Sequence, residues 1–167
     1  MKSLILFGSK YGTAEICANK LKEYLNGEID IINIANNNDV LLDRYDNIII
    51  GSSVYAGAFN KNVKAFIENN KNKLINKKLG LFMCCMSQGE RIIEQFEQNV
   101  PKEILEVAVV KSNFGGGLKF SKMNFFEKKI IKMIAKKDKD LGDIDGKSDV
   151  SMINEEAIKK FAETMEG

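Results

Sequence analysis

Residues 2–15 read KSLILFGSKYGTAE and contain the three parts of one structural unit. The apolar run 2–8 predicts a buried strand, residues 9–12 form a polar turn, and apolar residues recur at helical spacing from Ala14 onward. A turn that leads directly from a strand into a helix aims backbone N–H groups and the positive end of the helix at an anion. This stretch therefore predicts a strand–loop–helix unit with an anion-binding loop.

The same alternation continues along the chain. Four further apolar runs predict strands at 28–34, 47–51, 79–86 and 105–110. Amphipathic patterns predict helices at 59–67, 92–100 and 157–165, and Asn154 marks the start of the last of these helices. The Asn/Asp-rich residues 36–39 suit the connection between the second and third predicted strands. Right-handed crossovers place such helices on both faces of a parallel sheet. We therefore expect an α/β fold with a doubly wound five-stranded parallel sheet, formed by a single domain over residues 1–167.

The composition argues against several classes of function. The chain has no histidine, which removes the usual general base, the Ser-His and Cys-His nucleophile pairs and most zinc sites. Cys17, Cys84 and Cys85 lack metal-ligand spacing and are interpreted as reduced core thiols in a cytosolic setting. The net charge of +2 gives no reason to expect a nucleic-acid partner. Because no apolar segment approaches the ~18 residues that cross a bilayer, we expect a soluble, cytoplasmic protein with no metal.

Ligands of open parallel sheets bind beyond the carboxyl ends of the strands, where the strand order reverses. The loops after the first, third and fourth predicted strands are therefore the candidate site. The first loop has neither the Gly-Lys-Ser/Thr ending of a Walker loop nor the dinucleotide pattern Gly-x-Gly-x-x-Gly. It indicates a site for a phosphate monoester, with an ordinary turn between strand and helix as the alternative.

The stretch SKYGTA at 9–14 resembles the FMN phosphate loop of the flavodoxin family, which reads roughly Ser/Thr-x-Thr-Gly-x-Thr after the first strand. The resemblance covers nearly the whole chain and implies a flavodoxin-like fold and an FMN cofactor. It implies that the Ser9 and Thr13 hydroxyls bind the phosphate. Tyr11 and Ala14 replace two threonines of the pattern, so the backbone amides carry more of the binding. The cofactor-binding candidates in this loop are Ser9, Lys10, Tyr11, Gly12, Thr13 and Ala14.

The other two loops resemble the flavodoxin segments on either side of the flavin ring. Tyr55 is the candidate stacking residue, and Gly57 permits a turn whose carbonyl can meet the flavin N5 hydrogen; the alternative for Tyr55 is a core or partner-facing role. Met86 can pack against the ring, and the polar residues after it can bond the pyrimidine edge. The candidates are Ser53, Val54, Tyr55, Ala56 and Gly57 in one loop, and Cys85, Met86, Ser87, Gln88 and Gly89 in the other.

A receiver domain has the same topology but requires an aspartate at the end of the third strand. This chain has Gly51 and Ser52 there, which argues against a receiver.

A basic segment lies late in the chain, between 111 and 150, where FGGGLKF precedes FFEKKIIKMIAKKDKD. It predicts a helix with an apolar stripe of Phe126, Ile130, Met133 and Ile134, widened by Phe125 and Ile131, beside Lys128, Lys129, Lys132, Lys136 and Lys137. Such a helix can lie on an anionic membrane, dock an acidic partner, or pack on its own protein with a solvated lysine face. The segment also resembles the tail of quinone-dependent protoporphyrinogen dehydrogenases.

Three functions remain open from the sequence. The first is an FMN redox protein that transfers electrons to a redox partner protein and has no catalytic side chain of its own. The second is a flavin-dependent oxidoreductase with a quinone or porphyrin substrate. The third is a flavin-free membrane or protein interaction module. In each case residues 125–137 would supply any peripheral contact of this cytoplasmic protein with the inner face of the membrane.

Overall fold

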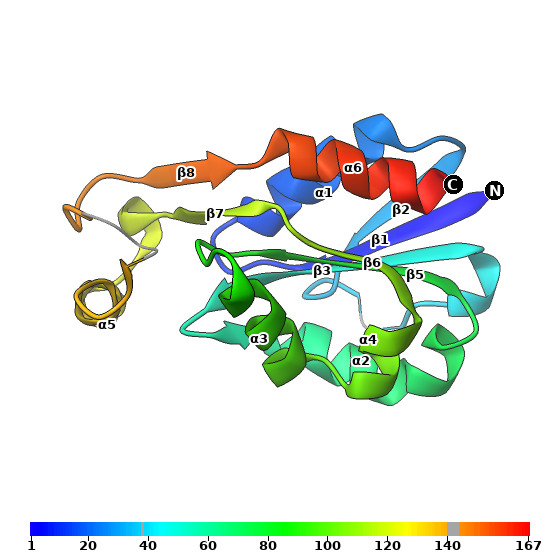
Figure 1. Ribbon diagram of the computed structural model, residues 1–167, viewed down its shortest axis with the longest axis horizontal. Coiled ribbons are helices and arrows are strands. Elements are labelled where there is room, and N and C mark those ends of the chain that lie inside the picture. The colour runs from blue at the N-terminus through cyan, green and yellow to red at the C-terminus, as the bar shows by residue number, and fades with distance from the viewer. Residues whose placement is uncertain (38, 140–143) are drawn as a thin grey trace.

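The computed structural model describes residues 1–37, 39–139 and 144–167. Its central sheet has five parallel strands in the spatial order β2-β1-β3-β5-β6 (Figure 1). The strands are β1 Lys2–Gly8, β2 Glu28–Asn33, β3 Asn47–Tyr55, β5 Lys78–Cys84 and β6 Ala108–Asn113. The short strand β4 Ala58–Phe59 folds back antiparallel on the end of β3. The predicted doubly wound five-stranded parallel sheet is confirmed.

Helices cover both faces of the sheet, as predicted. In Figure 1, α1 and α6 lie on one face and α2, α3 and α4 on the other. The helices are α1 Thr13–Tyr24, α2 Lys61–Leu74, α3 Glu90–Asn99, α4 Lys102–Val107, α5 Phe125–Ala135 and α6 Glu155–Glu166, with 3-10 turns η1 Leu42–Arg44 and η2 Phe120–Lys122. Within the described ranges, none of these helices has the length and apolar character needed to span a bilayer.

The core beneath α1 and α6 is organised around three phenylalanine rings. Phe82 on β5 stacks on Phe114 with ring centroids 4.6 Å apart, and Phe161 of α6 meets Phe114 edge to face at 5.2 Å. Gly51 lies opposite Phe82 in the pairing of β3 with β5, and a side chain at this position would collide with the Phe82 ring. The glycine is therefore required by packing between neighbouring strands.

Three details of the sequence prediction are wrong. The run 105–110 is divided between α4 and β6, because a short apolar run suits a helix as well as a strand. Phe59 belongs to β4, since α2 begins only after Asn60, whose side chain accepts a hydrogen bond from the Asn62 amide at 3.0 Å. Ile93 belongs to the apolar pattern that predicted the helix at 92–100, but its side chain is 59% exposed because α3 packs on the core through Phe96 instead.

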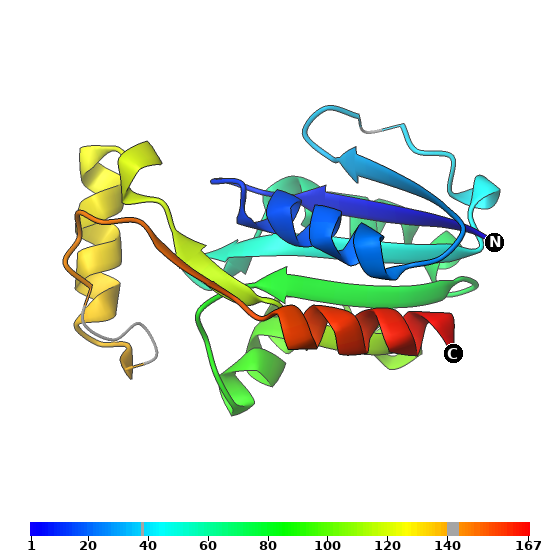
Figure 2. The same cartoon turned by 90° about the horizontal axis from the view of Figure 1, so that it is seen from above.

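The late segment contains a two-stranded antiparallel ribbon that the sequence did not predict. Strands β7 Gly115–Leu118 and β8 Val150–Ile153 form it and extend from the sheet to α5 (Figure 2). Gly115 has a φ of 81° and would, with a side chain, collide with the Met152 carbonyl. The glycine run thus allows β7 to approach its neighbours closely. Asn38 of the predicted 36–39 connection and residues 140–143 of the late segment lie outside the described residues.

Replacing Gly51 by alanine is expected to destabilise the fold by about 1–3 kcal/mol, because the new methyl group must displace Phe82 from its stack. Urea unfolding measures this change. The double variant Gly51→Ala with Phe82→Leu should lose less free energy than the sum of the single variants, since a smaller side chain makes room for the methyl group. Additive losses would contradict the proposed contact.

Candidate functional site

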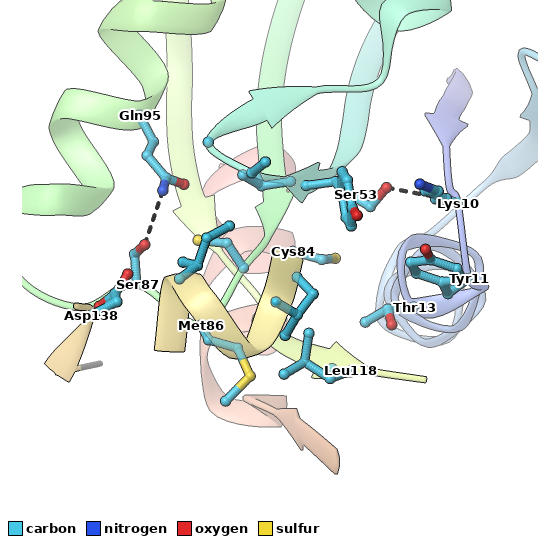
Figure 3. Close-up of a pocket in the computed structure, with 18 of the residues that line it drawn as sticks. Lys10, Tyr11, Thr13, Ser53, Cys84, Met86, Ser87, Gln95, Leu118 and Asp138 are labelled. Carbon is cyan, nitrogen blue, oxygen red and sulfur yellow. Dashed lines mark hydrogen bonds between the residues drawn. The ribbon is translucent and has the colours of Figure 1, made fainter. Parts of the chain in front are cut away.

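The loops after β1, β3 and β5 surround a cavity of about 350 Å³ at the carboxyl end of the sheet. Lys10, Tyr11 and Thr13 lie at one end of this cavity, and Ser87, Gln95 and Asp138 at the other (Figure 3). The volume is within the range of small-molecule sites. The fold therefore brings the three predicted loops together around one space.

The first loop leads from β1 into α1 and has the geometry of an anion-binding turn. Gly12 has a φ of 97°, and α1 begins directly after it without a side-chain cap. The Ser9 hydroxyl accepts a hydrogen bond from the Gly12 amide at 2.9 Å, and the Ser53 hydroxyl accepts one from the Lys10 amide at 3.3 Å. Because no side chain caps α1, the amides of its first turn have no partner within the helix and can bind an anion.

The second loop is a tight turn between β3 and β4. Ala56 and Gly57 both have positive φ angles, of 49° and 78°, and Ala56 is the only non-glycine residue with this conformation in the part of the chain that the structure describes. The Gly57 carbonyl accepts a hydrogen bond from the Asn99 side chain at 2.9 Å. The Lys10 ammonium lies 3.8 Å from the centre of the Tyr55 ring, a cation–π contact. Tyr55 is thus held beside the first loop.

The third loop is fixed by Asn113, the last residue of β6. The Asn113 amide nitrogen donates to the carbonyls of Cys85 and Ser87, each at 3.1 Å, and its oxygen accepts from the Cys85 and Gly115 amides. Four hydrogen bonds from one side chain therefore join this loop to the start of the ribbon. The Ser87 hydroxyl accepts a hydrogen bond from Gln95 at 3.0 Å, which ties the loop to α3 as well.

The fourth side of the cavity comes from the late segment. Leu118, Met123, Ile131 and Ile134 line it, so α5 presents part of its apolar stripe to the cavity. Two ion pairs hold α5 in this position. Glu127 in its first turn pairs with Lys10 at 2.6 Å, and Asp138, beyond its last turn, pairs with Arg91 of α3. The helix therefore spans the opening between the first loop and α3.

The charges around Lys10 stabilise one another. The hydrogen bond from Lys10, aided by the Asn124 amide, lowers the pKa of Glu127 to about 2. Burial lowers the pKa of Lys10, but the bond to Glu127 and the nearby tyrosines outweigh it and leave that pKa raised. Burial is the main cause of the raised pKa of Tyr11. At neutral pH the pair of Lys10 and Glu127 is therefore fully charged.

Three buried polar side-chain atoms make no hydrogen bond of normal geometry among the described residues: the hydroxyls of Tyr11 and Tyr55, and Oε1 of Gln95. The Tyr11 hydroxyl is near enough to Lys10 and Glu127 to influence their pKa values, but its geometry is not that of a hydrogen bond. All three residues line the cavity. A buried polar group left unpaired costs about 1–3 kcal/mol, so their concentration at one place indicates a ligand that supplies partners. Together with the anion-binding loop, this arrangement fits a ligand such as FMN, with a flat aromatic body, polar edges and one phosphate.

Comparison with known proteins agrees with this arrangement. The model of the flavodoxin domain matches residues 4–145. The chain is also 33% identical over 128 residues to the flavodoxin-like domain-containing protein BilS of Clostridioides difficile (strain CD3), an alignment that covers 71% of this chain and 70% of that protein. The chain belongs to the flavodoxin family.

Solved structures share the fold of this flavodoxin-family protein. Flavodoxin from Streptococcus pneumoniae TIGR4 superposes with a TM-score of 0.57 at 14% identity, covering 99% of this chain and 98% of its own. Oxidised flavodoxin 1 from Bacillus cereus has a TM-score of 0.52 at 19% identity and covers 81% and 95%. At these identities the likeness concerns the fold alone.

Most of the predicted site residues of this flavodoxin-family protein line the cavity. They are Lys10, Tyr11, Thr13, Ser53, Val54, Tyr55, Ala56, Gly57, Cys85, Met86 and Ser87. Five predicted residues do not line it: Ser9, Gly12, Ala14, Gln88 and Gly89. Ser9 and Gly12 shape the first loop through their mutual hydrogen bond, and the Ala14 side chain is fully buried in the core, leaving its amide for the loop. Gln88 is exposed, and Gly89 begins α3.

The structure adds site residues that the sequence analysis missed. Arg91, Gln95 and Asp138 form the polar end of the cavity, and Asn113 positions the third loop. The amphipathic pattern of residues 125–137 was the one signal in the sequence that this late segment could contribute to the site, since its Ile131 and Ile134 line the cavity. Nothing local to Asn113 or Gln95 marked them, because their partners are distant in sequence.

The three cysteines are free and buried, in agreement with the interpretation as core thiols. Cys84 and Cys85 pack into the cores on opposite faces of the sheet. A hydrogen bond with Cys17, together with burial, raises the pKa of Cys84 well above its usual range. Cys84 therefore remains a protonated thiol, which argues against a role as a nucleophile.

In the Lys10→Met variant, the titration midpoint of Glu127 is expected to rise from about 2 toward the ordinary glutamate value of about 4.3, because the ammonium that stabilises the carboxylate is gone. Carbon-detected NMR titration of the side-chain carboxyl groups measures this shift. In the parent protein, the pair should stabilise the fold fully above pH ~4.3 and cease to do so as the pH falls through about 2. Glu156, which pairs with Lys160 on α6, serves as the control and should keep its midpoint.

Proposed function

We propose that this protein binds FMN in the cavity at the carboxyl end of the sheet and transfers electrons. The observation that carries the proposal is the convergence of the anion-binding loop with the three unpartnered polar atoms of Tyr11, Tyr55 and Gln95 on one cavity. Membership in the flavodoxin family supports the same ligand. A structural neighbour from Lactobacillus acidophilus is a flavoprotein in complex with FMN, and it covers 67% of this chain at 15% identity and a TM-score of 0.50.

Each loop would hold a different part of the cofactor. The amides of Tyr11, Thr13 and Ala14, with the Thr13 hydroxyl, would bind the phosphate at the positive end of α1. The Lys10 and Gly12 amides already donate to Ser53 and Ser9, and these bonds keep the loop in shape. Tyr55 would provide an aromatic face for the ring, and Met86 a polarizable one. Ser87 and Gln95 would meet its polar edge. Bound FMN would supply the redox chemistry by accepting and releasing electrons.

The position of α5 over the cavity favours an electron carrier over an enzyme that binds an organic substrate beside the cofactor. Ile131 and Ile134 close the side of the cavity and would exclude water from the ring, while the ion pairs of Glu127 and Asp138 hold the helix in place. A space of about 350 Å³ is at the small end of ligand sites, so one cofactor would occupy it. Electrons could then pass without a second organic molecule entering the cavity.

Replacing both Ser9 and Thr13 by alanine is expected to weaken FMN binding about tenfold or more. The Thr13 substitution removes a hydrogen bond to a charged phosphate, which contributes about 1.5–3 kcal/mol, and without the Ser9 hydroxyl the Gly12 turn is no longer held in shape. Riboflavin, which lacks the phosphate, should bind parent and variant equally and is the matched control. Fluorescence titration of either flavin measures both affinities. The Tyr55→Leu variant should instead weaken both ligands several-fold, since it removes the aromatic face.

Failure of the parent protein to bind FMN at micromolar concentrations would falsify the cofactor assignment and favour the flavin-free interaction module. Equal losses for FMN and riboflavin in the Ser9 and Thr13 variant would mean that the first loop supports the fold and does not bind the phosphate.

A second candidate function is an oxidoreductase of the protoporphyrinogen or quinone dehydrogenase type. The apolar wall from Leu118, Met123, Ile131 and Ile134 favours it, because such a wall suits a hydrophobic substrate if α5 moves aside. A turnover assay of the FMN-loaded protein with protoporphyrinogen and a menaquinone analogue distinguishes this enzyme from an electron carrier. We expect no turnover above that of free FMN, and saturable turnover would replace the carrier proposal with the enzyme.

A further inference from the structure

The face of α5 that points away from the cavity is apolar and exposed. Phe125 and Phe126 are 75% and 73% exposed, and Met133 is 57% exposed. Residues 126, 130 and 133 follow one line along the helix by their spacing. Ile134, next to Ile130 on the helix surface, and Ile131 lie at the edge of this stripe that lines the cavity. The predicted apolar stripe is thus wider than the protein covers. Burial of a stripe is what normally stabilises an amphipathic helix, so this exposed part indicates a contact with something else.

The segment carries five lysines, of which Lys128 is half-buried and four are exposed with the stripe: Lys129, Lys132, Lys136 and Lys137. Among the described residues, none of the five forms an ion pair with a carboxylate. The acidic side chains at the two ends of α5, Glu127 and Asp138, pair with Lys10 and Arg91 instead. Within the ranges that the structure describes, the lysines of α5 therefore carry positive charge that no carboxylate pairs with.

The position of α5 leaves this face accessible. The helix lies at the end of the molecule opposite both chain termini, joined to the sheet by the β7–β8 ribbon (Figure 2). It projects beyond the layers of the α/β core in both views (Figures 1 and 2). A broad, flat surface can thus approach α5 without meeting the helices that cover the sheet.

The residue types on this face favour a lipid surface over a protein. The cores of protein interfaces are enriched in arginine and depleted in lysine. Helices that lie in the membrane interface combine lysines on the polar side with large apolar residues such as phenylalanine on the other. Residues 125–137 contain five lysines and no arginine, with two phenylalanines that are about three-quarters exposed. Lysine stems can extend past the apolar side chains to reach lipid phosphates.

We propose that the outer face of α5 binds the surface of an anionic phospholipid bilayer, with Phe125, Phe126 and Met133 entering the headgroup boundary and the lysines contacting lipid phosphates. The same helix forms a wall of the cavity through Ile131 and Ile134. Membrane binding would therefore place the cavity directly behind the bilayer surface, one helix away from it. This inference stands apart from the flavin, since no residue of the outer face is assigned to cofactor binding.

Sedimentation with vesicles tests the proposal, using the full chain and scoring protein in the pellet. The parent should bind vesicles that contain one-third phosphatidylglycerol in phosphatidylcholine, and pure phosphatidylcholine vesicles much more weakly. Replacing Lys129, Lys132 and Lys136 by glutamine should lower the partition coefficient at least about tenfold. The matched control replaces Lys22, Lys61 and Lys64, which are exposed on α1 and α2, and should bind like the parent. Raised salt should weaken the parent's binding.

The apolar contribution is tested separately with Phe126→Ser and Met133→Ser together. Both side chains are exposed, so the fold should persist, as circular dichroism and thermal unfolding would confirm, while vesicle binding falls several-fold. The control pair Leu41→Ser and Ile93→Ser replaces residues of similar exposure elsewhere. Absence of parent binding to anionic vesicles at low ionic strength, or equal losses in test and control variants, would overturn the proposal. Because protein is scored, neither outcome depends on whether FMN binds.

Discussion

The arrangement depends on the parallel pairing of β1 with strands on both of its sides. Ile5 lies opposite Ile31 of β2 and Ile49 of β3, so the end of β1 is fixed from two directions at the place where the strand order reverses. Parallel pairing brings the carboxyl ends of neighbouring strands to one edge. Three loops that are far apart in the sequence consequently meet there and form three sides of the cavity, and the late segment adds the fourth.

The sequence predicted those parts of the structure that depend on local pattern. The strand–loop–helix unit at 2–15, the 3.6-residue spacing of α5 and the cap of α6 at Asn154 were all readable because each is defined by neighbouring residues. The resemblance of SKYGTA to a flavodoxin loop then located the site. The fifth strand was misplaced because residues 105–110 form a short run that is apolar apart from Glu106, and such a run suits a helix and a strand equally.

Features that depend on contacts between residues distant in the sequence could not be predicted from the sequence. Asn113 looks like any polar residue at the end of a strand, and its four hydrogen bonds become evident only when β6 is placed beside β5. The glycines of β7 carry no strand signal, since their small size serves close packing against β8 and the third loop. The amphipathic pattern of α5 predicted a helix but not which side faces the cavity, because that choice is made by the pairs of Glu127 with Lys10 and Asp138 with Arg91.

The ribbon that carries α5 begins and ends at one point of the core. The Asn154 amide donates to the Phe114 carbonyl at 2.9 Å, and Gly115 pairs with Ile153, so the chain leaves β6 and enters α6 through adjacent residues. The whole excursion is therefore a cassette inserted between two elements whose ends already touch. Exchanging this segment would change what covers the cavity and what the protein meets outside it, while the order and pairing of the five parallel strands would stay the same. The strands that hold the protein together and the residues that cover its cavity are thus separate parts of the chain.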